Sequence, residues 1–144
     1  MQHNISEALH GLTLSYRKAL KHLAAEADIL IPVTHIRAIK CITNIENCSA
    51  RDIAKRLRLD KSQVARLVKD LLEQDYIEKD KHPTNNRCQV ISLTAAGKGL
   101  QQKIAHVDNQ ARTQMCSGMT QQEIESFIQL TELMKSNLTQ YSKD

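Results

Sequence analysis

The sequence predicts a mainly α-helical protein that carries one small β-hairpin. The chain of 144 residues contains only four glycines and two prolines, a composition that favours long helices with few turns. Apolar residues recur every three or four positions over most of its length, as they do in amphipathic helices. Two short apolar runs, at 76–77 and 89–93, flank a polar segment of turn composition at 81–87. Aromatic residues make up 3% of the chain, so we expect an aliphatic core.

The first helix is expected from about residue 4 to residue 27. Its apolar side chains recur at three-four spacing, and Asn4 with Glu7 supplies a capping box at its start. Pro32 suits the first turn of a second helix, because proline lacks the N–H that this turn leaves without a helical partner. The second helix should end within residues 44–47, and its apolar face consists of Ile36, Ile39, Ile42 and Ile45.

Two short helices joined by a tight connection are expected next. Ser49 with Asp52 forms the capping signature of one, and Asp60 with Gln63 forms that of the other. Two such helices predict a helix-turn-helix, and the hairpin that follows makes it a winged helix. The second helix of the pair carries its apolar residues at helical spacing: Val64, Leu67, Val68, Leu71 and Leu72.

This second helix has hydrogen-bond donors on the face opposite its apolar residues. Such side chains bond to phosphates and base edges, Gln with adenine and Arg with guanine being the favoured geometric pairs. Residues 48–88 hold ten Lys and Arg against seven Asp and Glu, which accounts for three of the chain's four net positive charges. The candidate DNA-binding residues are Ser49, Arg51, Lys61, Ser62, Gln63, Arg66, Lys69, Lys81, Asn86 and Arg87.

Two longer helices are expected in the last third of the chain. Thr94 caps the first of them and Gly118 ends it. Thr120 with Glu123 forms a capping box for the second. The apolar stripe of the first is Gly97, Leu100, Ile104, Val107, Ala111 and Met115, and that of the second is Ile124, Phe127, Thr131, Met134, Leu138 and Tyr141.

Three segments around the hairpin follow a known pattern without a gap. They are D-K-S-Q-V-A-R-L-V-K-D-L-L-E-Q-D-Y-I-E-K from residue 60, P-T-N-N-R from residue 83 and V-I-S-L-T-A-A-G from residue 90. In these segments the chain resembles the MarR family of bacterial winged helix-turn-helix transcriptional regulators. The resemblance implies a dimeric DNA-binding regulator, usually a repressor, and no enzymatic activity.

The chain departs from the family pattern at three places. Asp75 stands where the family usually has glycine, at a turn position that Asp can occupy with positive φ. Lys69-Asp70 reverses the usual order of acid and base. Asn85 replaces the wing aspartate, so a charge pair with Arg87 becomes a neutral contact, which predicts a wing that is more mobile without DNA.

The apolar stripes of the first and last helices run over more turns than a small winged helix can cover. We therefore expect a homodimer in which these helices interlock, although an intramolecular bundle is the alternative. A two-fold dimer places two recognition helices about one helical turn of DNA apart and predicts a pseudo-palindromic site. The expected division of one compact chain is 1–31, an N-terminal dimerisation helix, 32–93, the DNA-binding winged helix-turn-helix, and 94–144, the C-terminal dimerisation helices.

Two further kinds of site are considered. The resemblance implies a small-molecule effector pocket between the dimerisation helices and the winged helix, where Arg17, Thr34, His35 and Arg37 could hold an anionic, often aromatic, ligand; exposed helix polarity is the alternative explanation. The second hypothesis is a thiol sensor, with cysteines that act only as small, inert hydrophobic side chains as the alternative. Cys48 precedes a helix N-terminus, which could lower the pKa of its thiol, and Cys88 adjoins Arg87 in the wing.

Other classes of function find no support in the sequence. It has no G-x-S-x-G or P-loop motif, and its His and Cys residues lack metal-ligand spacing, so we expect no enzyme, cofactor or metal. No apolar run approaches membrane-spanning length and no signal peptide is evident, so a cytoplasmic location is expected. The remaining alternative is a winged-helix module that contacts proteins without DNA specificity.

Overall fold

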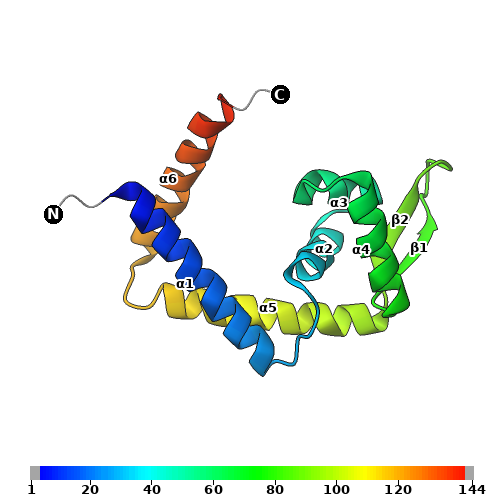
Figure 1. The fold of residues 1–144 in the computed structure, drawn as a ribbon, viewed down its shortest axis with the longest axis horizontal. Helices are drawn as coiled ribbons and strands as arrows, with labels where there is room; N and C mark the ends of the chain where they lie inside the picture. The colour runs from blue at the N-terminus through cyan, green and yellow to red at the C-terminus, as the bar shows by residue number, and fades with distance from the viewer. Residues whose placement is uncertain (1–3, 142–144) are drawn as a thin grey trace.

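The computed structural model describes residues 4–141, which form six helices and one antiparallel hairpin (Figure 1). The fold class predicted from the sequence is confirmed. The long helix α5 runs along the molecule, with α2, α3, α4 and the hairpin at one end and with α6 and the start of α1 at the other. The elements are α1 (Ile5–Glu26), α2 (Val33–Asn44), α3 (Ala50–Leu57), α4 (Lys61–Glu73), β1 (Ile77–Lys81), β2 (Gln89–Leu93), α5 (Ala95–Met115) and α6 (Gln121–Thr139).

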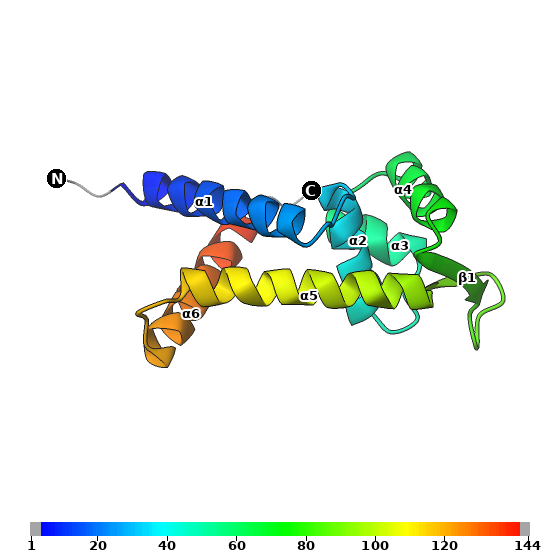
Figure 2. The same cartoon turned by 90° about the horizontal axis from the view of Figure 1, so that it is seen from below.

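The core lies within the winged helix. Ile39 from α2, Ile53 from α3 and Leu71 from α4 are each 0% exposed. The first half of α5 covers one side of this cluster (Figure 2), to which it contributes Leu100 and Ile104. The aliphatic core predicted from the composition is therefore observed.

The junction between β2 and α5 depends on a glycine. A Cβ atom added to Gly97 would lie 2.0 Å from the carbonyl oxygen of Tyr76. Thr94 fixes this approach, because its N–H donates to the same oxygen over 3.1 Å while its hydroxyl oxygen accepts from the N–H of Gly97. The preceding turn contains Asp75 at φ 63°, the positive φ that the sequence predicted there.

The hairpin differs from the prediction in its first strand. The sequence placed that strand at 76–77, whereas β1 spans Ile77–Lys81 and pairs from Ile77 with Leu93 to Lys81 with Gln89. Of its residues only Ile77 is buried. The backbone ladder with β2 continues through polar residues, and hydrophobic alternation could not reveal this extension. The wing tip is thus residues 82–88.

The capping predictions are confirmed at the start of four helices, α3, α4, α5 with Thr94, and α6, and are corrected elsewhere. Both bonds of the capping box are present in α3, α4 and α6. In α1 the Asn4 side chain caps the N–H of Ser6 and Glu7 takes no part, so the predicted box was wrong. Pro32 is the N-cap residue of α2, one position before its first turn. Helix α5 ends at Met115, and Gly118 lies in the turn beyond it at φ +79°.

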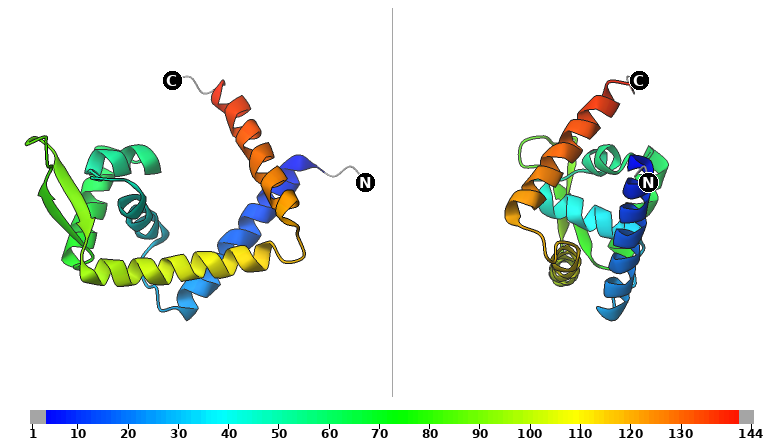
Figure 3. Two further views of the ribbon diagram at one scale, coloured as in Figure 1. Left: turned by 180° about the vertical axis from the view of Figure 1, so that it is seen from behind. Right: turned by 90° about the vertical axis from the view of Figure 1, so that its left-hand side faces the viewer.

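The two ends of the chain leave apolar surface uncovered. Helix α1 packs on α5, yet its N-terminal half is exposed, and α6 projects away from the core without burying a residue (Figure 3). Within residues 4–141 no helix is long and apolar enough to cross a membrane. The exposed apolar residues of these two helices are Ile5, Leu9, Leu12, Leu14, Phe127, Ile128, Leu130, Leu133, Met134 and Leu138.

Candidate nucleic-acid interface

Helix α4 has apolar residues on its buried face and polar residues on its exposed face. Val64, Leu67, Val68 and Leu71 are buried against α2 and α3, which fixes the rotation of the helix about its axis. The opposite face is exposed over the whole length of the helix. Its exposed polar residues include all five that the sequence proposed as DNA contacts: Lys61, Ser62, Gln63, Arg66 and Lys69.

Two candidate contacts have part of their bonding capacity already used. The Oε1 atom of Gln63 accepts from the N–H of Asp60 over 3.0 Å. A paired contact with adenine needs both ends of the amide, so Gln63 would have to accept from the base with the remaining lone pair of this oxygen or give up the cap. The hydroxyl of Ser49 donates to Asp52 Oδ2 over 2.9 Å. Arg66 forms no ion pair within the described chain, and its role as a base reader stays a prediction.

A groove with cations at its edge lies between α3 and α4. It has a volume of about 700 Å³ and a floor of small and branched apolar side chains. Arg51, Lys61 and Lys69 line it, which brings three of the predicted contacts together. Lys79 from β1 also lines the groove, and sequence reasoning missed it because the predicted strand stopped at residue 77. The four cations form a positive rim beside the outer face of α4.

The wing carries the remaining predicted contacts. Lys81, Asn86 and Arg87 are exposed. Asn85 reaches its neighbour through the backbone, since its Oδ1 accepts from the N–H of Arg87 over 3.1 Å. The sequence predicted a neutral contact in place of a charge pair with the Arg87 side chain, whereas this contact is made to the main chain of Arg87. The greater mobility expected of this wing stays a prediction.

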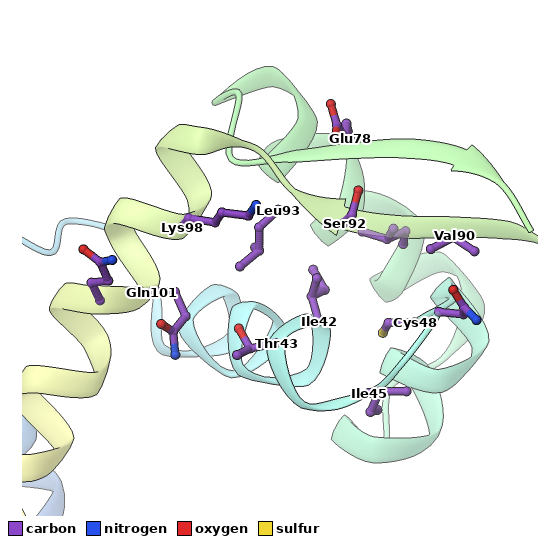
Figure 4. Close-up of a pocket in the computed structure, with 13 residues that line it drawn as sticks. Ile42, Thr43, Ile45, Cys48, Glu78, Val90, Ser92, Leu93, Lys98 and Gln101 are labelled. Carbon is purple, nitrogen blue, oxygen red and sulfur yellow. The ribbon is translucent and has the colours of Figure 1, made fainter.

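The proposed effector residues are not gathered around one hollow. Arg17, Thr34 and Arg37 are exposed, and none of them lines either groove described here. His35 is half-buried and its Nε2 lies 3.2 Å from Asp70 Oδ2, which joins α2 to α4. Asp70, which belongs to the reversed Lys69-Asp70 order noted in the sequence, therefore has His35 as its partner, and the sequence did not indicate this contact. A second groove of about 620 Å³ lies between the end of α2, β2 and the start of α5 (Figure 4).

The redox prediction for Cys48 was wrong. Its side chain is 1% exposed, and burial, followed by the nearby charges of Asp52 and Cys41, raises the pKa of the thiol to about 12. Desolvation thus outweighs the helix N-terminus that was expected to lower the pKa. Cys88 is exposed in the wing, and its role as a redox site stays a prediction. Among residues 4–141 no group of three or more His, Cys, Asp or Glu could hold a metal ion.

A helix-turn-helix with an outward row of donors, followed by a basic hairpin, defines a winged-helix nucleic-acid-binding protein. Residues 31–89 match the model described as "MarR family". Over these residues, which span the winged helix, the chain is similar to the MarR family of transcriptional regulators.

Individual relatives and solved structures show the same similarity. The chain is 28% identical over 76 residues to the HTH-type transcriptional regulator BilQ of Clostridium symbiosum (strain WAL-14163), a match that spans 53% of each protein. A MarR/EmrR family regulator from Acinetobacter sp. ADP1 is 26% identical, with a TM-score of 0.73 over 96% of this chain and 99% of that one. A mutant of S. aureus MepR, bound to an oligodeoxyribonucleotide, shares the fold at 17% identity, with a TM-score of 0.62 over 95% of this chain and 99% of that one.

Proposed function

We propose that this protein is a repressor that binds a pseudo-palindromic DNA site as a homodimer. The observation that carries the proposal is the outer face of α4, where Ser62, Arg66 and Lys69 are exposed opposite four buried residues. A helix of this kind fits the major groove and fixes which side chains reach base edges. Such a regulator would work in the cytoplasm, where bacterial DNA lies.

Contacts to phosphate would come from both sides of α4. Arg51, Lys61 and Lys79 border the groove between α3 and α4, and Lys81 and Arg87 lie in the wing. Cations in such positions neutralise phosphates and fix the register of the protein on the duplex. The MepR mutant that is bound to an oligodeoxyribonucleotide has the same fold, which supports this part of the proposal.

The uncovered helices support the dimer. Leu138 is 69% exposed and Phe127 is 47% exposed, on a helix that buries none of its residues. Large apolar residues exposed in this number on two helices are typical of a protein interface. A second copy offers the same stripes, and a two-fold pair of them would cover both at once. The same symmetry would place the two α4 helices on one face of the DNA.

The most detailed part of the proposal is that a small anionic effector releases the protein from DNA. It would act near the start of α2, where Thr34 and Arg37 are exposed and His35 touches α4 through Asp70. A ligand that displaced α2 there would move the recognition helix through this contact. The Nδ1 atom of His35 is buried without a hydrogen-bond partner within the described residues, and in the neutral ring it could accept only from a hydroxyl or N–H of the ligand, not from its anionic group.

Binding to duplex DNA at several salt concentrations tests the function. A winged helix that contacts roughly six to ten phosphates should lose affinity steeply as salt is added. In a plot of the logarithm of the binding constant against the logarithm of the salt concentration, each phosphate contact should add about −0.9 to the slope. Selection from a random duplex pool should then enrich an inverted repeat. A protein-contact module would show a shallow slope and no enriched sequence, and this result would contradict the proposal.

A further inference from the structure

The wing tip is organised around one nitrogen atom of a histidine. The Nδ1 atom of His82 accepts from the N–H of Thr84 over 3.2 Å and from the N–H of Asn85 over 3.1 Å. The hydroxyl of Thr84 lies 3.3 Å from the same atom. The N–H of His82 donates to the carbonyl oxygen of Cys88 over 3.1 Å and closes the loop. The imidazole thus takes the place that an Asn or Asp side chain occupies in a capped turn.

This arrangement needs a neutral ring. A nitrogen that accepts hydrogen bonds must carry a lone pair, so the ring proton of His82 must lie on Nε2. A protonated imidazole has an N–H at both nitrogens and can only donate. Protonation would therefore remove the acceptor from two backbone N–H groups at once. Histidine is the side chain that changes charge between about pH 5 and 8.

These hydrogen bonds connect His82 through Asn85 to Arg87, the cation of the wing tip. Asn85, whose N–H is held by His82, accepts from the N–H of Arg87 at its Oδ1. Its carbonyl oxygen accepts from the N–H of Cys88 over 3.1 Å, and its Nδ2 lies 3.5 Å from Cys88 Sγ. The backbone of Arg87 is thereby fixed through Asn85 to His82.

We propose that His82 is a positioning residue for the wing, whose neutral ring holds Arg87 ready for DNA and whose protonation releases the tip. The inference rests on the proposed DNA-binding function. The charged residues next to it in the hairpin are Asp80, Lys81 and Arg87, all exposed, and Asp80 Oδ1 accepts from the N–H of Lys81. Within residues 4–141 no carboxylate pairs with His82 to stabilise its charged form.

Affinity measured against pH at constant salt tests the proposal. The His82→Asn variant keeps a side-chain acceptor that does not titrate, so its affinity should depend less on pH than that of the wild type. From about pH 8 to pH 5.5 the wild type should lose about fivefold more affinity than His82→Asn, the contribution of one ordinary hydrogen bond. His106→Asn, in an exposed position on α5, controls for the loss of a histidine elsewhere and should keep the wild-type slope.

Nuclear magnetic resonance of the ring nitrogens and tip amides, without DNA, provides the second measurement. At about pH 8 the ring of His82 should carry its proton on Nε2, and the amide signals of Thr84 and Asn85 should move as the ring titrates. Parallel affinity profiles of wild type and His82→Asn, or a proton on Nδ1 in the neutral ring, would overturn the inference. A wild type that binds no DNA at any pH would instead contradict the proposed function. The resonance experiment would still test the role of His82, because it needs no DNA.

Discussion

Helices α4 and α6 have similar apolar spacing but opposite packing. In α4 the four residues of the apolar face are at most 4% exposed, whereas in α6 every large apolar residue of the stripe from Phe127 onward is at least 44% exposed. Both helices have a capping box at their start. The winged helix therefore has its core within one chain, while the terminal helices present an apolar surface that the chain itself does not cover. The comparison separates the part proposed to read DNA from the part proposed to assemble.

A charge placed in the uncovered stripe should have the largest effect. Leu138→Asp should convert the dimer into a monomer, because burying a carboxylate in an apolar interface carries a large desolvation penalty. Sedimentation measures the mass directly. Ser136→Asp adds the same charge on the opposite face of α6 and should leave the dimer intact. A dimer mass unchanged in both Leu138→Asp and Met134→Asp would disprove the interface.

The junction between the two regions offers a test of packing. Gly97→Ala should destabilise the protein by about 1–3 kcal/mol or more, because its Cβ has no room beside the carbonyl of Tyr76. Gly99→Ala is the matched control two residues further on, since a Cβ there has nothing within 4 Å. That variant should raise stability by about 0.5–1 kcal/mol through helix propensity. Chemical denaturation measures both, and equal effects would refute the close approach.

Within the winged helix, Arg66→Ala tests base reading. The variant should bind its specific site about 1–3 kcal/mol more weakly and lose preference at one base position in each half-site. Affinities for a set of duplexes with single base-pair changes would show this. An equal loss on every duplex, with the preference retained, would make Arg66 a phosphate contact.

The smallest expected effect belongs to the wing. Arg87→Ala should weaken specific and non-specific binding alike. It should also make the dependence of the logarithm of the binding constant on the logarithm of the salt concentration shallower by about 0.9, the contribution of one phosphate contact. Lys103→Ala removes an exposed cation from α5 and should leave the slope as it is. Indistinguishable slopes for wild type and Arg87→Ala would show that this wing does not touch DNA.

The sequence predicted most of the fold because the deciding signals are local. The capping pairs of α3, α4 and α6, the spacing of apolar residues in α4 and the positive φ of Asp75 each depend on residues within a few positions of one another. The polar part of β1 was missed, since pairing with β2 and not side-chain alternation extends the strand to Lys81. Lys79 was missed for the same reason.

The site was predicted less well because burial and long-range contacts decide it. Cys48 precedes a helix N-terminus as expected, but only the packed structure shows that its thiol is almost fully buried. The contact between His35 and Asp70 joins residues 35 positions apart, and no sequence pattern indicated it. Likewise, Gln63 was proposed both as a cap and as a base reader, and the geometry shows that its amide oxygen already accepts one hydrogen bond in the cap.

The central claim is that the uncovered helices pair two winged helices so that they read one DNA site together. Hydroxyl-radical footprinting on a duplex selected from a random pool tests it most directly. The expected result is two protected segments on one face of the duplex, about one helical turn apart and related by two-fold symmetry. A single protected segment, or protection that does not depend on sequence, would contradict the claim.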